Sequence, residues 1–257
     1  MRIVVKVGTS TLTHSSGHLN IMQFERLCKV LSDLKNAGHE IVLVSSGAIG
    51  MGVGKLSLAG RPDDMPTKQA AAAVGQCELM YLYDRQFSEY NHTVAQILIT
   101  GEELEHPDLR QNFENTIYRL LELGALPVIN ENDTVATAEI AVGDNDTLSA
   151  IVATGIRADL LILLSDVDGL CSADPRTDRA AHIIPVVEEL TPEIRALAGG
   201  EGSTLGTGGM RTKLHAAEIA TAGGVEMIIA NGARPQDLYR IVAGEPVGTR
   251  FRRKENP

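Results

Sequence analysis

Residues 160–164 of the chain are Leu-Leu-Ile-Leu-Leu, five consecutive apolar side chains in a segment of strand length. A strand with one solvent-exposed face alternates apolar and polar residues, so an uninterrupted apolar run indicates a strand that is covered on both faces. Comparable runs stand at residues 3–7 (Ile-Val-Val-Lys-Val) and 40–45 (Glu-Ile-Val-Leu-Val-Ser). Further strands are predicted at residues 93–99, 126–129 and 225–230.

Helical patterns separate these predicted strands. Residues 20–36 place Phe24, Leu27 and Leu31 on one face of a helix, and Gly38 is expected to end it. Further helices are predicted at residues 66–90, 108–123 and 210–222. Because strands that alternate with helices form mostly parallel sheets, the expected fold is α/β: a three-layer sandwich around an open, mostly parallel central sheet.

One domain is expected over residues 1–257, because no Pro-, Gly- or Ser-rich linker divides the chain. We expect two lobes that share one continuous sheet, an N-terminal lobe of about residues 1–150 and a C-terminal lobe of about residues 151–257. Small and apolar residues alternate at 134–142, which favours a β-hairpin after the fourth strand.

The composition excludes several classes of protein. Apolar residues make up 44% of the chain and charged residues 22%, which excludes a disordered chain. The net charge is −10, aromatic residues make up 4%, and Trp is absent, so a nucleic-acid-binding protein is disfavoured. The basic cluster Arg250, Arg252, Arg253 and Lys254 is expected to be a frayed, solvated terminus.

The cysteines and the N-terminus indicate the compartment. Cys28, Cys77 and Cys171 are far apart and odd in number, so no disulfide framework is expected and a reducing environment is favoured. No apolar segment has the length of a signal peptide or a membrane span. We expect a cytoplasmic protein that does not act at a membrane.

Polar or Gly-rich stretches follow the predicted strands, where ligands collect in sheets of this kind. Lys6 lies near the end of the first strand, where its ammonium group either pairs with an anion or reaches solvent beyond the strand end. Gly8 then allows close backbone approach, as in a phosphate site. Ser46 follows the second strand in a small-residue turn that could bind an anion or be an ordinary helix cap. Ser165 and Asp166 follow the fifth strand.

Two acidic loops and one glycine loop complete the set. Residues 130–133 (Asn-Glu-Asn-Asp) and 143–146 (Gly-Asp-Asn-Asp) lack the pattern of a calcium loop, but they could bind an ammonium group and orient lysines. Residues 206–213 (Gly-Thr-Gly-Gly-Met-Arg-Thr-Lys) suit a phosphate nest before a helix, or a flexible surface loop. They match neither a P-loop nor a dinucleotide fingerprint. The seven histidines have no metal spacing.

Together these stretches resemble the amino acid kinase family and, within it, the kinases that act on glutamate. The resemblance runs from Ile3 to about Phe251. It rests on VVKVGTSTLT (4–13), VSSGAI (44–49), KQAAAAVGQ (68–76), PVINENDTVATAEIAVGDNDTLSA (127–150), ADPR (173–176) and GTGGMRTKLHAA (206–217). It implies ATP-dependent phosphorylation of the γ-carboxylate of L-glutamate, the first step of proline biosynthesis, with Mg²⁺ carried by the nucleotide.

The resemblance also implies roles for individual residues. Lys6 and Lys213 would clamp the transferred phosphoryl group, and Asp146 would organise them. The residues implied to hold glutamate are Ser46, Asn130, Asp133, Asp144 and Asn145. The residues implied to hold ATP are Lys6, Gly8, Ser165, Asp166, Thr207, Gly208, Gly209, Met210, Arg211, Thr212 and Lys213. No metal ligand is assigned.

The sequence departs from the family pattern in two places. Position 165 is Ser where Thr is common, which preserves the hydroxyl. Many relatives continue into a PUA module that this sequence lacks, so we expect a kinase-only form or a shortened chain. A homo-oligomer, feedback inhibition by proline and transfer of the product to glutamyl phosphate reductase are further expectations. The alternatives are a related kinase with a different acid substrate and a non-catalytic amino-acid sensor.

Overall fold

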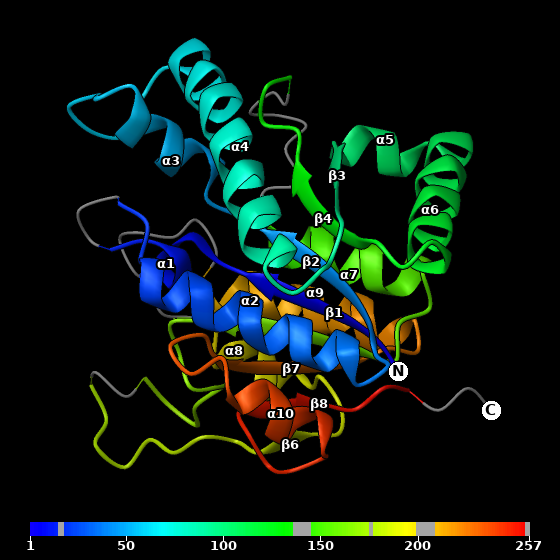
Figure 1. Cartoon of the computed structure of the whole chain (residues 1–257). Helices are drawn as coiled ribbons and strands as arrows, with labels where there is room; N and C mark the ends of the chain where they lie inside the picture. Colours follow the sequence, from blue (N-terminus) through cyan, green and yellow to red (C-terminus); the bar gives the residue numbers. More distant parts are fainter. Residues whose placement is uncertain (15–17, 136–144, 175–176, 199–208, 255–257) are drawn as a thin grey trace.

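The computed structural model describes residues 1–14, 18–135, 145–174, 177–198 and 209–254. Within them, eight strands form one sheet in the order β3-β4-β2-β1-β5-β7-β8-β6 (Figure 1). Neighbouring strands are parallel except β7 and β8, which are antiparallel. The strands are β1 (Arg2–Val7), β2 (Glu40–Ser45), β3 (Val94–Ile99), β4 (Leu126–Glu131), β5 (Leu160–Ser165), β6 (Val186–Val187), β7 (Glu226–Asn231) and β8 (Thr249–Phe251).

Helices cover both faces of the sheet, which confirms the predicted three-layer α/β sandwich (Figure 1). The helices are α1 (Thr9–Leu12), α2 (Ile21–Asn36), α3 (Ala48–Lys55), α4 (Met65–Ser88), α5 (Gly101–Glu105), α6 (Pro107–Glu122), α7 (Asn145–Gly155), α8 (Pro192–Ala196), α9 (Met210–Ala222) and α10 (Asp237–Val242). None of the helices in the described ranges is both long and apolar enough to cross a lipid bilayer.

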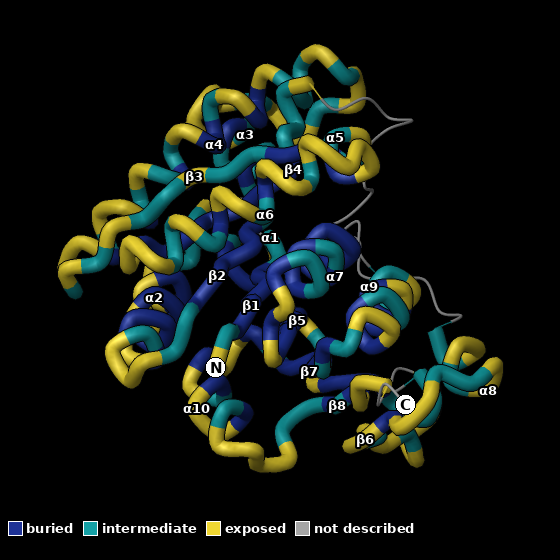
Figure 2. Tube along the Cα trace, turned by 90° about the vertical axis from the view of Figure 1, so that its right-hand side faces the viewer, coloured by how far each residue is buried: buried dark blue, intermediate teal, exposed yellow. Residues whose placement is uncertain are grey.

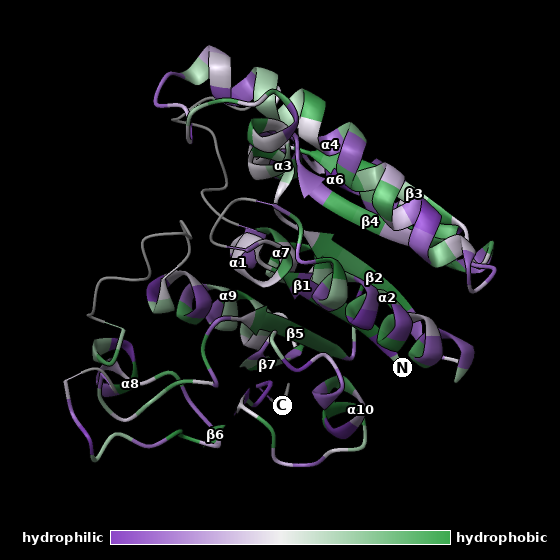
Figure 3. Cartoon of the chain, turned by 60° about the vertical axis from the view of Figure 1, so that its left-hand side comes forward, coloured by the Kyte–Doolittle hydropathy of each residue, from purple (hydrophilic) through white to green (hydrophobic). Residues whose placement is uncertain are grey.

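The sheet separates two hydrophobic cores, and strand β1 contributes to both. Ile3, Val5 and Val7 pack into the core under α2, α4 and α10, whereas Val4 packs into the core under α6, α7 and α9. Successive side chains of a strand point to opposite faces, which explains this division. Figure 2 shows the central strands buried beneath helices with exposed outer surfaces, and Figure 3 shows β2, β4 and β5 as largely hydrophobic.

The predicted elements are confirmed with small shifts at their ends. The helix predicted at residues 66–90 spans Met65–Ser88, and the one predicted at 108–123 spans Pro107–Glu122. Strand β4 continues past the predicted apolar run through two buried polar residues, Asn130 and Glu131. The hairpin predicted at 134–142 lies outside the described residues, except for Thr134 and Val135, which are in a turn. The three cysteines are free, as predicted.

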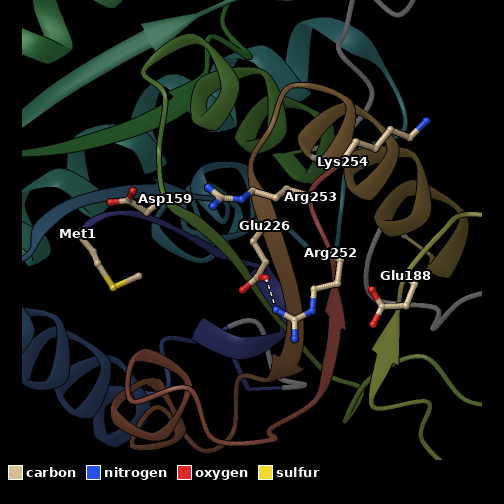
Figure 4. Close-up of a pocket in the computed structure, with 7 residues that line it drawn as sticks. All are labelled: Met1, Asp159, Glu188, Glu226, Arg252, Arg253 and Lys254. Carbon is tan, nitrogen blue, oxygen red and sulfur yellow. Dashed lines mark hydrogen bonds and ion pairs between the residues drawn. The ribbon is translucent and has the colours of Figure 1, made fainter. Parts of the chain in front are cut away.

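The prediction of a frayed basic terminus is wrong for the residues up to Arg252. Thr249 and Phe251 are buried in β8, which pairs with β7. Arg250 forms an ion pair with Glu226, and Arg252 lies 3.2 Å from Glu226 Oε2 (Figure 4). The buried Phe251 between two basic residues, together with the acidic partner on β7, therefore fixes this segment to the sheet.

The same segment lines a pocket at the amino ends of the strands (Figure 4). Met1 precedes β1, Asp159 precedes β5, and Glu226 begins β7, so these residues mark one edge of the sheet. The polar stretches predicted to bind ligands follow the opposite ends of the strands. The pocket in Figure 4 therefore lies on the edge away from the candidate site.

Candidate active site

The candidate site lies at the carboxyl ends of four neighbouring strands, in the order β4, β2, β1 and β5. The chain builds β1 to β4 on one side of the sheet and then crosses β1 to build β5 and the strands beyond. In sheets of this type, ligands bind where the strand order changes direction. Strand β1, which carries Lys6, is at the centre of this arrangement.

Lys6 is directed by the alternation of β1. It shares a face with Val4, toward the core under α7, and not with Val5 and Val7. Lys6 is 8% exposed, and its Nζ lies 2.6 Å from Oδ1 of Asp146, the second residue of α7. The structure thus confirms that this buried lysine has an anionic partner.

Asp146 also pairs with a second lysine. Lys213 Nζ, on α9, donates to Asp146 Oδ2 at 3.1 Å. Thr212 Oγ1 lies 2.9 Å from the same oxygen. Asp146 is fully buried and Lys213 is 4% exposed, so water screens these charges poorly. Burial alone would raise the pKa of Asp146, but Lys6 and Lys213 outweigh burial and hold that pKa below its usual value.

The charges of this triad do not cancel. Two ammonium groups share one carboxylate, so Lys6, Asp146 and Lys213 carry a net charge of +1. A buried positive charge at a sheet edge attracts an anion, and this attraction grows as negative charge develops beside it. We refer to these three residues as the lysine–aspartate centre.

Beside this centre lies a network of neutral side chains. Asn145, next to Asp146 in the chain, donates from Nδ2 to Ser46 Oγ at 2.7 Å and to Asn130 Oδ1 at 3.0 Å. Asn130 donates in turn to Gln76 Oε1 at 2.9 Å. Asn145 Oδ1 is buried with no hydrogen-bond partner in the described part of the chain. We call Ser46, Gln76, Asn130 and Asn145 the amide network.

Three of the four members of the amide network were predicted from the sequence, and Gln76 was not. Gln76 belongs to α4 and lies far from any strand end in the sequence, so the pattern of polar residues after strands does not include it. The signal was available: Gln76 is a polar residue on the inner face of an Ala-rich helix.

Asp133 lies in the turn after β4, close in sequence to Asn130. Burial raises the pKa of its carboxyl, and the charge of Arg61 opposes that shift. No hydrogen bond between Asp133 and the amide network is present among the described residues. A nearby cation would favour the ionised form of Asp133. Asp144 lies outside the described residues.

Gly8, Ser165 and Asp166, which are implied to hold ATP, lie where β1 and β5 end. The backbone of Gly8 follows β1 beside the end of β5, and a Cβ added to Gly8 would lie 3.6 Å from Lys6 Nζ. Ser165 ends β5, and its Oγ lies 3.1 Å from Asp166 Oδ1.

Further residues of the predicted ATP set stand at the start of helix α9. Gly209 precedes α9, Met210 is half-buried, and Arg211 is exposed. Thr212, implied to hold ATP, contacts the carboxylate of Asp146. Thr207 and Gly208 lie outside the described residues.

A profile of the amino acid kinase family matches residues 1–231, nine-tenths of the sequence. The chain belongs to this family. It is 54% identical to a glutamate 5-kinase of Clostridium perfringens, over 97% of this chain and 94% of that protein. It is 51% identical to a glutamate 5-kinase of Caldanaerobacter subterraneus, over 100% of this chain and 69% of that protein.

Solved structures support the fold of this amino acid kinase family member. An isopentenyl phosphate kinase matches with a TM-score of 0.70 and 18% identity, over 98% of this chain and 100% of that one. A carbamate kinase from Giardia lamblia bound to AMP-PNP matches with a TM-score of 0.70 and 18% identity, over 98% of each chain. At this identity the likeness establishes the three-layer architecture alone.

A metal ion has no evident protein site in the described ranges. There, no group of three or more His, Cys, Asp or Glu side chains is placed to hold one. Both oxygens of Asp146 already contact lysines.

Proposed function

We propose that this chain transfers the γ-phosphoryl group of ATP to the γ-carboxylate of L-glutamate, giving L-glutamyl 5-phosphate and ADP, the first step of proline biosynthesis. The relatives that are about half identical over the whole chain carry the name glutamate 5-kinase. The observation that carries the proposal is the buried contact of Lys6 and Lys213 with Asp146.

The reaction depends on neutralising negative charge and on aligning the reactants more than on proton transfer. A carboxylate with an ordinary pKa of about 4.3 is already ionised near neutral pH, so one of its oxygens can attack the γ-phosphorus without a general base. The bond from phosphorus to the β-phosphate oxygen breaks, and ADP leaves as the anion. Two anions must approach each other, and their repulsion is the main obstacle.

The lysine–aspartate centre is suited to that obstacle. Lys6 is the penultimate residue of β1, between the two halves of the sheet, and Lys213 lies in the first turn of α9. Asp146 holds both ammonium groups in place, and the three side chains together carry a net positive charge. Preorganised charge of this kind stabilises a transition state without reorganisation during the reaction.

Recognition is assigned to the two sides of this centre. On the β4 and β2 side, Ser46, Asn130 and Asn145 would bind glutamate, with Asp133 and Asp144 near its ammonium group. On the β5 side, Gly8, Ser165, Asp166 and the segment from Thr207 to Lys213 would bind ATP. Magnesium would enter on the phosphates of ATP, where it commonly keeps waters and few protein ligands.

The wider biology belongs to the same proposal. We infer a cytoplasmic enzyme that forms a homo-oligomer, that proline inhibits as the end product, and that passes its acyl phosphate to glutamyl phosphate reductase. Inhibition by proline is tested by titrating proline to millimolar levels at sub-saturating glutamate. A rate that does not change would dispose of that part of the proposal.

Trapping with hydroxylamine tests the reaction itself. The protein is incubated with Mg-ATP, hydroxylamine and, in turn, glutamate, aspartate, acetylglutamate or carbamate. We expect hydroxamate with glutamate alone, because hydroxylamine traps an acyl phosphate and this forms only on the acid that the enzyme phosphorylates. Product with another acid would support phosphoryl transfer to a carboxylate but contradict glutamate as the substrate. No hydroxamate and no ADP with any acid, in folded protein, would favour an amino-acid sensor.

A further inference from the structure

Helix α4 brings one more amide to the candidate site. Gln76 is 6% exposed, and its Oε1 accepts a hydrogen bond from Asn130 Nδ2 at 2.9 Å. Gln76 Nε2 is buried and has no hydrogen-bond partner among the described residues. A buried donor without a hydrogen-bond partner lowers the stability of a fold. The position of Gln76 beside Asn130 therefore points to a role other than stability.

One backbone group identifies which end of the Asn130 amide is its oxygen. The backbone N–H of Glu131 can only donate, and it donates to Asn130 Oδ1 at 2.9 Å. The other end of the Asn130 amide, Nδ2, therefore faces α4 and needs an acceptor there. Gln76 supplies that acceptor with its carbonyl oxygen.

The hydrogen bonds continue from Asn130 toward the proposed glutamate site. Asn130 Oδ1 also accepts from Asn145 Nδ2, whose second hydrogen goes to Ser46 Oγ. Both hydrogens of the Asn145 amide are then used, which leaves its buried Oδ1 able only to accept. Ser46 Oγ receives a hydrogen bond, so its own hydrogen is available to donate. The network thus presents one acceptor and one donor.

Helix α4 is rigidly placed for this purpose. Gly75 lies against the backbone of α3, where an added Cβ would collide with the carbonyl oxygen of Ala48. A Cβ on Gly52 of α3 would collide with the backbone of Ala71 on α4. Two turns beyond Gln76, Tyr83 lies 2.7 Å from Ser45 Oγ, beside the turn that holds Ser46. Backbone-to-backbone packing thus holds α4 beside the Ser46 turn.

We propose that Gln76 is a positioning residue for amino-acid recognition. Its carbonyl oxygen holds the amides of Asn130 and Asn145 in the orientation that makes Asn145 Oδ1 an acceptor for an ammonium group. The same orientation makes Ser46 a donor to a carboxylate. An α-amino acid carries both of these groups, and a simple dicarboxylic acid lacks the ammonium group. This inference rests on the proposed function.

The test compares two substitutions of similar size. Gln76→Met removes the acceptor, and Gln76→Glu keeps an oxygen toward Asn130. Values of kcat and KM are measured for glutamate and for glutarate, which lacks the ammonium group. For Gln76→Met we expect KM for glutamate to rise about tenfold with little change in kcat, since a buried polar partner is left unpaired. The preference for glutamate over glutarate should also fall about tenfold, whereas Gln76→Glu should keep that preference.

Two controls separate positioning from stability. Phe87→Leu loosens the buried far end of α4, and Gln111→Met makes the same kind of change at an exposed site on α6. Both should keep the wild-type preference between glutamate and glutarate. A Gln76→Met variant that keeps the preference, or a Gln76→Glu variant that loses as much of it, would overturn the inference. If the wild type does not phosphorylate glutamate, the proposed function itself fails.

Discussion

The lysine–aspartate centre and the amide network are adjacent in the fold and largely buried, yet they differ in charge and in the kind of contact that they make. Asn145 and Asp146 are consecutive residues of α7, but Asn145 joins neutral side chains on the β4 and β2 side, while Asp146 joins two cations. The centre carries a net charge of +1, and the network carries none. One helix end therefore supplies both parts of the site.

This difference teaches how the site divides its work. A buried charge interacts strongly with an anion but discriminates little between anions of similar shape. Amides have fixed donors and acceptors, and a site that hydrogen-bonds a substrate group rejects the analogue that lacks it. The account therefore assigns turnover to the lysine–aspartate centre and selection of the amino acid to the amide network.

The largest effect is expected from Asp146→Asn. It leaves two buried ammonium groups without their carboxylate, which should lower the free energy of unfolding by about 3–5 kcal/mol. We expect kcat to fall at least 100-fold, because both lysines lose their alignment. Urea unfolding and steady-state kinetics measure the two effects. Asp108→Asn, at an exposed position of α6, is the matched control. A loss of stability no larger than that of the control would contradict the buried triad.

The contribution of Asp146 to the stability of the fold should depend on pH. Since the pKa of Asp146 is lowered on folding, its ionisation stabilises the fold above the ordinary Asp pKa, about 3.9. That contribution is lost as the pH falls through the lower folded value. The stability difference between wild type and Asp146→Asn should therefore shrink below about pH 4. A difference that grew on acidification would reverse the sign of the argument.

Lys213→Ala should lower kcat by about 10²–10³, the cost of removing one group that stabilises the transition state. Asp146 keeps Lys6 as a partner, so the loss of stability should be smaller than in Asp146→Asn. Lys29→Ala, an exposed lysine of α2, is the control. If KM for ATP rose while kcat stayed at the wild-type value, Lys213 would bind the nucleotide without acting on the transition state.

Asp133→Ala should affect recognition of glutamate and not turnover. We expect KM for glutamate to rise about 10–100-fold with KM for ATP unchanged, as for loss of a partially buried charge partner. Burial raises the pKa of Asp133, so its carboxyl becomes neutral earlier on acidification than an exposed Asp. In the wild type, KM for glutamate should accordingly rise as the pH falls through that raised pKa. Unchanged glutamate affinity in Asp133→Ala would remove this residue from the site.

The smallest effect is expected from Gly8→Ala. The backbone of Gly8 has φ −83° and ψ 159°, which alanine adopts without strain, so the melting temperature should not change. The added methyl group would lie 3.6 Å from Lys6 Nζ, in the space assigned to phosphate. KM for ATP should rise a few-fold, by the loss of about 1 kcal/mol of binding free energy. An unchanged KM for ATP would place the phosphates elsewhere.

Sequence patterns predicted the fold well because its strands are covered on both faces, which makes their apolar runs continuous. They missed β8, a strand of three residues whose identity depends on pairing with β7 and on Glu226, which is distant in the sequence. The helices α5 and α8, of five residues each, are too short to show a periodic pattern. Tertiary contacts decide such elements.

The residues of the candidate site also divide into those that the sequence predicted and those that depend on tertiary contacts. Lys6 was predictable, because a lysine in a buried strand requires an anion, and the acidic loop after β4 offered candidates. That Asp146 is the partner of both lysines was implied by the family resemblance alone, because the pairing depends on how α7 and α9 pack. Gln76 was missed for a related reason: only the folded chain brings the inner face of α4 against the end of β4.

Calorimetric titration of Lys213→Ala with glutamate, in the presence of a non-hydrolysable ATP analogue, tests the division of work most directly. The account predicts that the glutamate Kd stays within a few-fold of the wild type even though phosphoryl transfer is at least 100-fold slower, since Lys213 acts on the moving group. A Kd weakened in proportion to the lost rate would contradict it, because recognition and turnover would then depend on the same charge.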